Sequence, residues 1–155
     1  MKMLKSVSSA LLAGALIAGA LPLHAEVDNP DAWIKYRESV MNTLKYHSRA
    51  AKAVTEGKPA LPLNVHLLAH ARAMRDAAGF IPDLFPEGSD FGETEAKASV
   101  WEDKEGFDAH AKKLAEATDA LLKAAEADDR AAAGKAMQQV GKACKGCHDD
   151  YREKD

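Results

Sequence analysis

The sequence predicts an all-α fold, an antiparallel up-and-down four-helix bundle. In the 155-residue chain, apolar residues recur three and four positions apart in four segments, the spacing that places them on one face of a helix. No segment shows the alternation of apolar and polar residues that is typical of a half-buried strand. Two of the connections between the four segments are short, which favours antiparallel neighbours packed around one core.

The first helix is expected to begin near Asn29 and to end at about Glu56. Asp28 and Asn29 offer a capping side chain, and Pro30 and an acidic residue follow in the first turn. Gly57 is a typical helix end, and a proline-rich connector comes after it. The expected inner face is mostly apolar and consists of Trp33, Ile34, Val40, Met41, Leu44, His47, Ala51 and Val54.

The second helix is expected from Leu63 to about Gly79, before Pro82. Its inner face consists of Leu63, Leu67, His70, Met74, Ala77 and Ile81. Residues 82–99 then hold two prolines and two glycines without clear periodicity, a loop longer than most in a compact domain. We expect this loop to span the outside of the fold or to guard a site.

The third and fourth helices follow the loop. The third is expected to begin at Val100, and its inner face repeats every seven residues at Val100, Phe107, Leu114 and Leu121. Asp128 and Asp129 are expected to cap the fourth helix. The inner positions of that helix are Ala133, Met137, Val140, Cys144, Cys147 and Tyr151.

The fourth helix carries a Cys-x-x-Cys-His motif, formed by Cys144, Cys147 and His148. This motif is the covalent attachment signature of a c-type haem, in which each thiol adds to one vinyl group of the porphyrin and the imidazole reaches the iron. Residues three and four apart share one face of a helix, so the three side chains lie on the same turn. The sequence therefore predicts a four-helix bundle with one covalently attached haem c, whose folding is coupled to haem attachment.

Three other interpretations of the two cysteines fit the sequence less well. A thioredoxin-like redox pair needs a βαβ setting, whereas residues 130–141 are alanine-rich and helical. A zinc site needs four ligands, usually from two such pairs, and the chain has only two cysteines. A disulfide across two intervening residues would close too small a loop to stabilise much.

Residues 1–25 have the pattern of a secretory signal peptide. Lys2 and Lys5 give a positive start, an apolar run follows, and Ala25 is a small residue that a signal peptidase accepts. An uncleaved membrane anchor is the alternative, which the shortness of the apolar run and Pro22 disfavour.

Residues 26–155 are expected to form a single domain that is periplasmic and outside the membrane after signal cleavage. About 130 residues suffice for one hydrophobic core, and covalent haem attachment in bacteria takes place outside the cytoplasm. The formal net charge of -3 gives no basic footprint for nucleic acid.

The residues around the motif resemble the class II cytochromes c, which comprise cytochrome c prime and its low-spin, methionine-ligated relatives. The likeness rests on residues 141–152, which hold the haem motif at the C-terminus as in that family. It extends to residues 35–41 in the first helix, to residues 84–86 in the loop, and to Val100 and Trp101 at the start of the third helix. It covers essentially all of the mature chain.

The resemblance implies a role for each matching residue. Cys144 and Cys147 would form the thioethers, and His148 would be the proximal iron ligand. Arg152 matches the basic residue of the family beside the proximal histidine, and Arg37 matches the arginine near the haem propionates. The family commonly dimerises through its first two helices, which implies a homodimer here.

Met41 decides between two functions that the resemblance implies. As the sixth iron ligand, with His148 as the fifth, it would form a low-spin centre for one-electron transfer between periplasmic redox proteins. As a non-ligating lid, it would leave a pentacoordinate iron that binds nitric oxide or carbon monoxide. The residues favour the electron carrier, which is not an enzyme. A third interpretation, a helical interaction module without haem, would require the motif to be accidental.

The remaining histidines, methionines and aromatic residues are expected to be structural. Met74 and Met137 lie on inner faces and are expected to pack there. The histidines are interpreted as ordinary polar or buried residues and not as iron ligands: His47, His66, His70 and His110. The aromatic residues are expected in the core: Trp33, Tyr36, Trp101 and Phe107.

Overall fold

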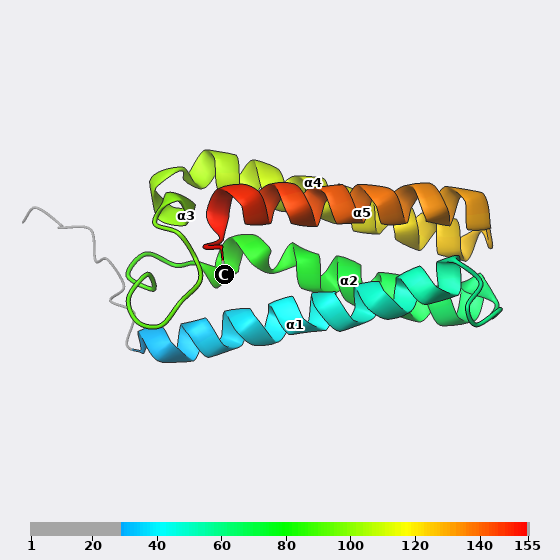
Figure 1. Cartoon of the computed structure of the whole chain (residues 1–155), viewed down its shortest axis with the longest axis horizontal. Helices are drawn as coiled ribbons and strands as arrows, with labels where there is room; N and C mark the ends of the chain where they lie inside the picture. Colours follow the sequence, from blue (N-terminus) through cyan, green and yellow to red (C-terminus); the bar gives the residue numbers. More distant parts are fainter. Residues whose placement is uncertain (1–28, 155) are drawn as a thin grey trace, which may run out of the picture.

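The computed structural model describes residues 29–154, so the expected signal peptide lies outside the described residues. Four main helices run antiparallel in an up-and-down bundle (Figure 1). They are α1 (Pro30–Thr55), α2 (Leu68–Gly79), α4 (Lys104–Glu126) and α5 (Arg130–Tyr151), with a short helix α3 (Ser99–Glu102) before α4. Residues 29–154 contain no β-strand, and the predicted four-helix bundle is confirmed.

The first helix follows the sequence prediction closely. The side chain of Asn29 accepts a hydrogen bond from the backbone N–H of Ala32 at 3.1 Å, and Pro30 occupies the first helical position. After the helix ends at Thr55, Gly57 adopts a φ of 72°, a left-handed conformation that glycine tolerates without steric cost. The chain then turns into the connector to α2.

Short irregular helices border α2 on both sides. A π-helical segment, η1 (Leu63–Leu67), precedes it, so the expected α-helix begins five residues later than predicted. A 3₁₀ turn, η2 (Ile81–Leu84), follows it and opens the expected loop.

The prediction of an unbroken third helix from Val100 is wrong, because the helix is interrupted at Asp103, between α3 and α4. The Asp103 carboxylate caps α4 by accepting from the backbone N–H of Gly106 at 3.1 Å. The same carboxylate accepts from the hydroxyl of Tyr151 on α5 at 2.7 Å. A Cβ at Gly106 would lie only 2.5 Å from that hydroxyl, so the close approach of the two helices requires glycine here.

One end of the bundle, which we call the closed end, contains the connections 56–62 and 127–129. Asp129 caps α5 by accepting from Ala132 N–H at 2.9 Å, as predicted. Asp128, which was also expected to cap α5, instead has a φ of 53° and accepts from Leu63 N–H at 3.1 Å. Arg130 donates to the carbonyls of Val54, at 2.5 Å, and Thr55, at 2.9 Å. The two connections are therefore tied to each other.

The core runs along the whole bundle and is built of small and aliphatic side chains. Its largest fully buried side chains include Leu63, Leu67, Met74, Leu84, Phe107 and Leu121. Met74 packs as expected. Tyr36 does not, because it is 49% exposed on the side of α1 away from the buried Ile34 and Arg37. In the described part of the chain, no helix has both the length and the apolar character needed to cross a membrane.

Candidate haem site

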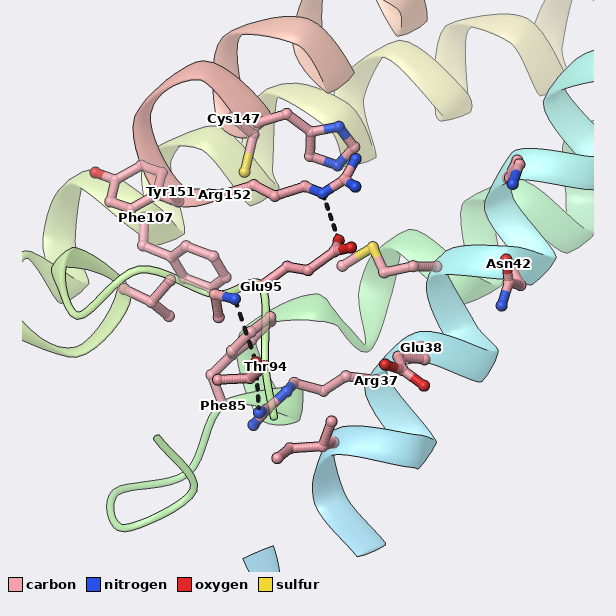
Figure 2. A pocket seen from close by; sticks show the side chains of 16 residues that line it. Arg37, Glu38, Asn42, Phe85, Thr94, Glu95, Phe107, Cys147, Tyr151 and Arg152 are labelled. Atoms are coloured by element: carbon pink, nitrogen blue, oxygen red, sulfur yellow. Dashed lines mark hydrogen bonds and ion pairs between the residues drawn. The ribbon is translucent and has the colours of Figure 1, made fainter. Parts of the chain in front are cut away.

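A cavity of about 440 Å³ lies between α1 and the last turn of α5, away from the closed end (Figure 2). We call this part of the molecule the cavity end. Its wall is built by α1, by α5, and by residues of the loop between η2 and α3. Phe85, Val100 and Phe107 supply apolar surface to the wall. The cavity can therefore hold a flat apolar group with polar substituents at its edge.

The α5 wall brings the residues of the Cys-x-x-Cys-His motif to the cavity. Cys147 and His148 line it, whereas Cys144 is half-buried beside the hydrophobic core. No disulfide joins the two cysteines. Burial raises the pKa of Cys144, and it raises the pKa of Cys147 to about 11. Neutral thiols of this kind do not fit a thioredoxin-like pair, which needs a stabilised thiolate.

The imidazole of His148 stands at the edge of the cavity next to Arg152. Its pKa lies below the ordinary histidine value, chiefly through partial burial and then through the positive charge of Arg152, whereas Asp149 and Glu95 act in the opposite direction. A neutral imidazole has a ring nitrogen with a free lone pair, which is the form that binds iron.

The α1 wall presents a thioether and a cation to the same cavity. Met41 is half-buried and lines the cavity from α1, together with Ile34 and Glu38. Arg37 also lines the cavity, and only 4% of its surface is exposed.

The Arg37 guanidinium holds the loop against α1. It donates to Ser89 Oγ at 2.8 Å and to the Ser89 carbonyl at 2.9 Å, and it lies 4.9 Å from the ring centroid of Phe85. Burial lowers its pKa from the ordinary arginine value. In residues 29–154 no carboxylate forms an ion pair with it. The cavity wall thus contains a buried cation that a propionate group can neutralise.

Aromatic rings line the floor of the cavity. Phe107 lies between Phe85 and Tyr151, with ring centroids 4.9 Å and 5.4 Å away and edge-to-face packing on both sides. The hydrogen bond of Tyr151 to Asp103 raises the pKa of the phenol to about 12. Tyr151 therefore stays a neutral hydrogen-bond donor and fixes the end of α5 on α4.

The loop segment 94–96 completes the wall and belongs to the loop that was expected to span the outside of the fold or to guard a site. Glu95 accepts from Arg152 Nε at 2.7 Å, as Figure 2 shows, and Ala96 forms an isolated antiparallel bridge with Arg152. An exposed glutamate in a segment without periodicity has no pattern that would have pointed to this contact.

The other residues considered in the sequence lie outside the cavity. His47 and His70 face each other across α1 and α2, with their Nδ1 atoms 3.0 Å apart. His110 lies 3.3 Å from the Asp150 carboxylate. Trp101 packs edge-to-face on Phe85, with ring centroids 5.9 Å apart, and its indole N–H donates to the Pro86 carbonyl at 2.9 Å.

The residues present fit a covalently attached haem. The thiols of Cys144 and Cys147 and the imidazole of His148 lie on one helical turn. The thioether of Met41 lines the cavity from α1, and the buried guanidinium of Arg37 can pair with a carboxylate of the haem. Among residues 29–154, no cluster of three or more histidine, cysteine or acidic side chains could hold a separate metal ion.

The known proteins that this chain resembles in sequence and fold include cytochromes c'. The family model of Cytochrome C' matches residues 32–152. Cytochrome c' of Pararhodospirillum photometricum is 40% identical over 126 residues, which are 81% of this chain and 99% of that protein. The solved cytochrome c' of Rubrivivax gelatinosus has a TM-score of 0.75 and 34% identity, covering 81% of this chain and 98% of its own. The nitric oxide complex of a cytochrome c prime variant from Alcaligenes xylosoxidans has a TM-score of 0.76 and 26% identity, covering 83% and 100%.

A four-helix bundle with this motif on the helix beside its cavity is a monohaem c-type cytochrome. The chain belongs to the cytochrome c' family, and it binds one covalent haem c with its iron. The predicted fold, family and cofactor are thereby confirmed. The residues alone favoured the methionine-ligated electron carrier, whereas the cytochrome c' relatives favour its alternative, the gas-binding protein.

Proposed function

We propose that this protein binds a small gas, nitric oxide or carbon monoxide, at a pentacoordinate haem in the periplasm, with Met41 as a non-ligating lid. The observation that carries the proposal is the cavity itself: His148 stands on one wall and Met41 on the other, within largely apolar surroundings. A solved relative is a nitric oxide complex, which supports the choice of ligand. Binding a gas converts no substrate, so the protein is not an enzyme in this proposal.

Each residue of the site has a part in this function. Cys144 and Cys147 would hold the porphyrin as thioethers, and His148 would ligate the iron on the α5 side. When bound, haem iron supplies an open coordination position and one-electron redox chemistry. Met41 would exclude water from the opposite side. Arg37 would pair with a propionate from its buried position, where a charge-assisted hydrogen bond is strong.

An electron carrier, in which Met41 ligates the iron, is the second candidate. Met41 places a thioether on the cavity wall, and a thioether is a recognised axial ligand that favours ferrous iron. In that arrangement Met41 and His148 would both hold the iron, without room for a gas. The haem would supply one-electron chemistry toward periplasmic redox partners.

Absorption spectra separate the two candidates. The protein is expressed in a host that attaches haem, and ferric and ferrous spectra are recorded for the wild type and for Met41→Ala. We expect a high-spin spectrum that the substitution leaves unchanged, and rapid uptake of carbon monoxide by the reduced protein. A low-spin spectrum with a weak far-red sulfur-to-iron band, lost in Met41→Ala, would instead establish the electron carrier. A protein without covalent haem would overturn both.

We also propose that residues 1–25 direct export of the protein to the periplasm.

We further propose a homodimer through α1 and α2. Large apolar side chains in this half of the chain are exposed, among them Tyr46 of α1 with 61% and Val65 of η1 with 59% accessible. Burying them against a second copy would remove apolar surface from water. Sedimentation of the haem-loaded protein tests the dimer, with Tyr46→Lys as the disrupting variant. A wild type that sediments as a monomer at micromolar concentration would contradict it.

A further inference from the structure

The loop segment 94–97 is fastened to the end of α5 by its backbone. Lys97 N–H donates to the Tyr151 carbonyl at 3.0 Å, and Glu153 N–H donates to the Glu95 carbonyl at 2.8 Å. These two bonds define the isolated antiparallel bridge between Ala96 and Arg152 beside the cavity. The backbone bonds therefore hold Glu95 and Arg152 side by side independently of the bond between their side chains.

The side chains of this pair meet at the rim of the cavity. Arg152 Nε donates to Glu95 Oε2 at 2.7 Å, and both residues line the cavity together with His148 (Figure 2). Both side chains are partly exposed, 63% for Glu95 and 39% for Arg152, so the ion pair itself contributes little to global stability. Its geometry, in contrast, is fixed by the backbone pairing.

We propose that Glu95 is a positioning residue for the iron centre, which holds the Arg152 guanidinium at the cavity rim beside His148. The two charges have opposite effects on an iron ligated by His148. The nearby cation favours ferrous over ferric iron, and the nearby carboxylate favours ferric iron. Glu95 acts both through its own charge and by keeping Arg152 close. The inference rests on the proposed role of His148 as iron ligand.

The two effects of Glu95 can be separated by a double-mutant cycle on the reduction potential. In the Arg152→Gln background, Glu95→Ala removes only a negative charge, so the potential rises. In the wild-type background, Glu95→Ala also removes the hydrogen bond that holds the Arg152 side chain at the cavity rim. The cation then lies farther from His148 on average, which lowers the potential and offsets part of that rise. We expect the two shifts to differ by about threefold in the redox equilibrium constant, ~28 mV at 59 mV per tenfold.

Glu153 provides the matched control, because it is an exposed carboxylate next to Arg152 in the chain. Glu153→Gln should shift the potential equally in both backgrounds, since its side chain does not hold the guanidinium. Equal shifts for Glu95→Ala in the two backgrounds would overturn the positioning role while leaving the haem site intact. Absence of a covalent haem couple in the wild type would overturn the proposed function and, with it, this inference.

Discussion

The two ends of the bundle are held together in different ways. At the closed end, side chains of the protein alone complete the packing, and Arg130 and Asp128 tie the two connections together. At the cavity end, α1 and α5 stand on opposite sides of a space of about 440 Å³, and the loop segment 94–97 bridges part of it. The closed end is therefore specified by packing, whereas the cavity end also depends on the haem.

The largest test of this difference removes the attachment points for the haem. In Cys144→Ala combined with Cys147→Ala, no thioether can form, so we expect complete loss of covalent haem, measured by acid extraction and the pyridine haemochrome spectrum. Native-state hydrogen exchange should then show lost protection in residues 94–98 and in the last turns of α5. The second half of α4, at the closed end, should keep its protection.

Two outcomes of that experiment would contradict the proposed difference between the closed end and the cavity end. Haem that resists extraction from the double variant would place the attachment elsewhere. Uniform loss of protection along all helices would mean that the closed end has no stability of its own. It would support the expectation from the sequence that folding as a whole is coupled to haem attachment.

The second test acts on the closed end alone. Leu121 is fully buried on α4. Leu121→Ala removes its packing and leaves a cavity, which should lower the free energy of unfolding by about 2–5 kcal/mol. Denaturant unfolding of the haem-loaded protein measures this loss. The visible spectrum should not change, because the haem site is at the other end.

An exposed position on the same helix serves as the control for Leu121. Glu116→Ala should change the free energy of unfolding by less than about 0.5 kcal/mol. A loss at Leu121 no larger than that at Glu116 would show that core packing does not hold the closed end. An altered haem spectrum in Leu121→Ala would show that the two ends are not independent.

The same contrast explains what the sequence could predict. At the closed end, the end of α1 before Gly57 and the Asp129 cap of α5 are local signals, so these two termini followed directly. The π-helical start at Leu63 did not follow from the apolar stripe. At the cavity end, the Cys-x-x-Cys-His motif identified the cofactor because its chemistry lies within one helical turn. The break at Asp103 escaped prediction, since it depends on a tertiary hydrogen bond to Tyr151, 48 residues away.

The loop residues that hold the two arginines of the cavity wall were missed for the same reason, because they are distant from those arginines in the sequence. Glu95 and Ser89 lie in a loop without periodicity, and their roles come from contacts with Arg152 and Arg37 that only the folded chain brings together. Tyr36 was wrongly expected in the core because an aromatic residue near an apolar stripe does not reveal which side of the helix it occupies.

A smaller effect is expected at the cap of α5. Asp129→Ala removes the acceptor for the Ala132 N–H and should lower the free energy of unfolding by about 1 kcal/mol. Asp129→Asn keeps a side-chain oxygen and should lose much less. Denaturant midpoints at constant slope measure both variants. Equal losses in the two would mean that the charge of Asp129, and not its cap, stabilises this end.

The smallest effect concerns the seam between α1 and α2, where His47 and His70 meet with Nδ1 atoms 3.0 Å apart. The pKa of His70 is lowered from its usual value, first by burial and then by His47 and His66. Because the folded state takes up this proton less readily than the unfolded state, stability is unaffected at neutral pH and falls as the pH drops below about 6.5. His70→Gln should flatten that decline in denaturant unfolding between pH 7.5 and 5. His66→Gln should leave most of it, since burial and His47 act more strongly. An unchanged decline in His70→Gln would assign the acid sensitivity to another group, and the cavity end would then be the first place to look for it.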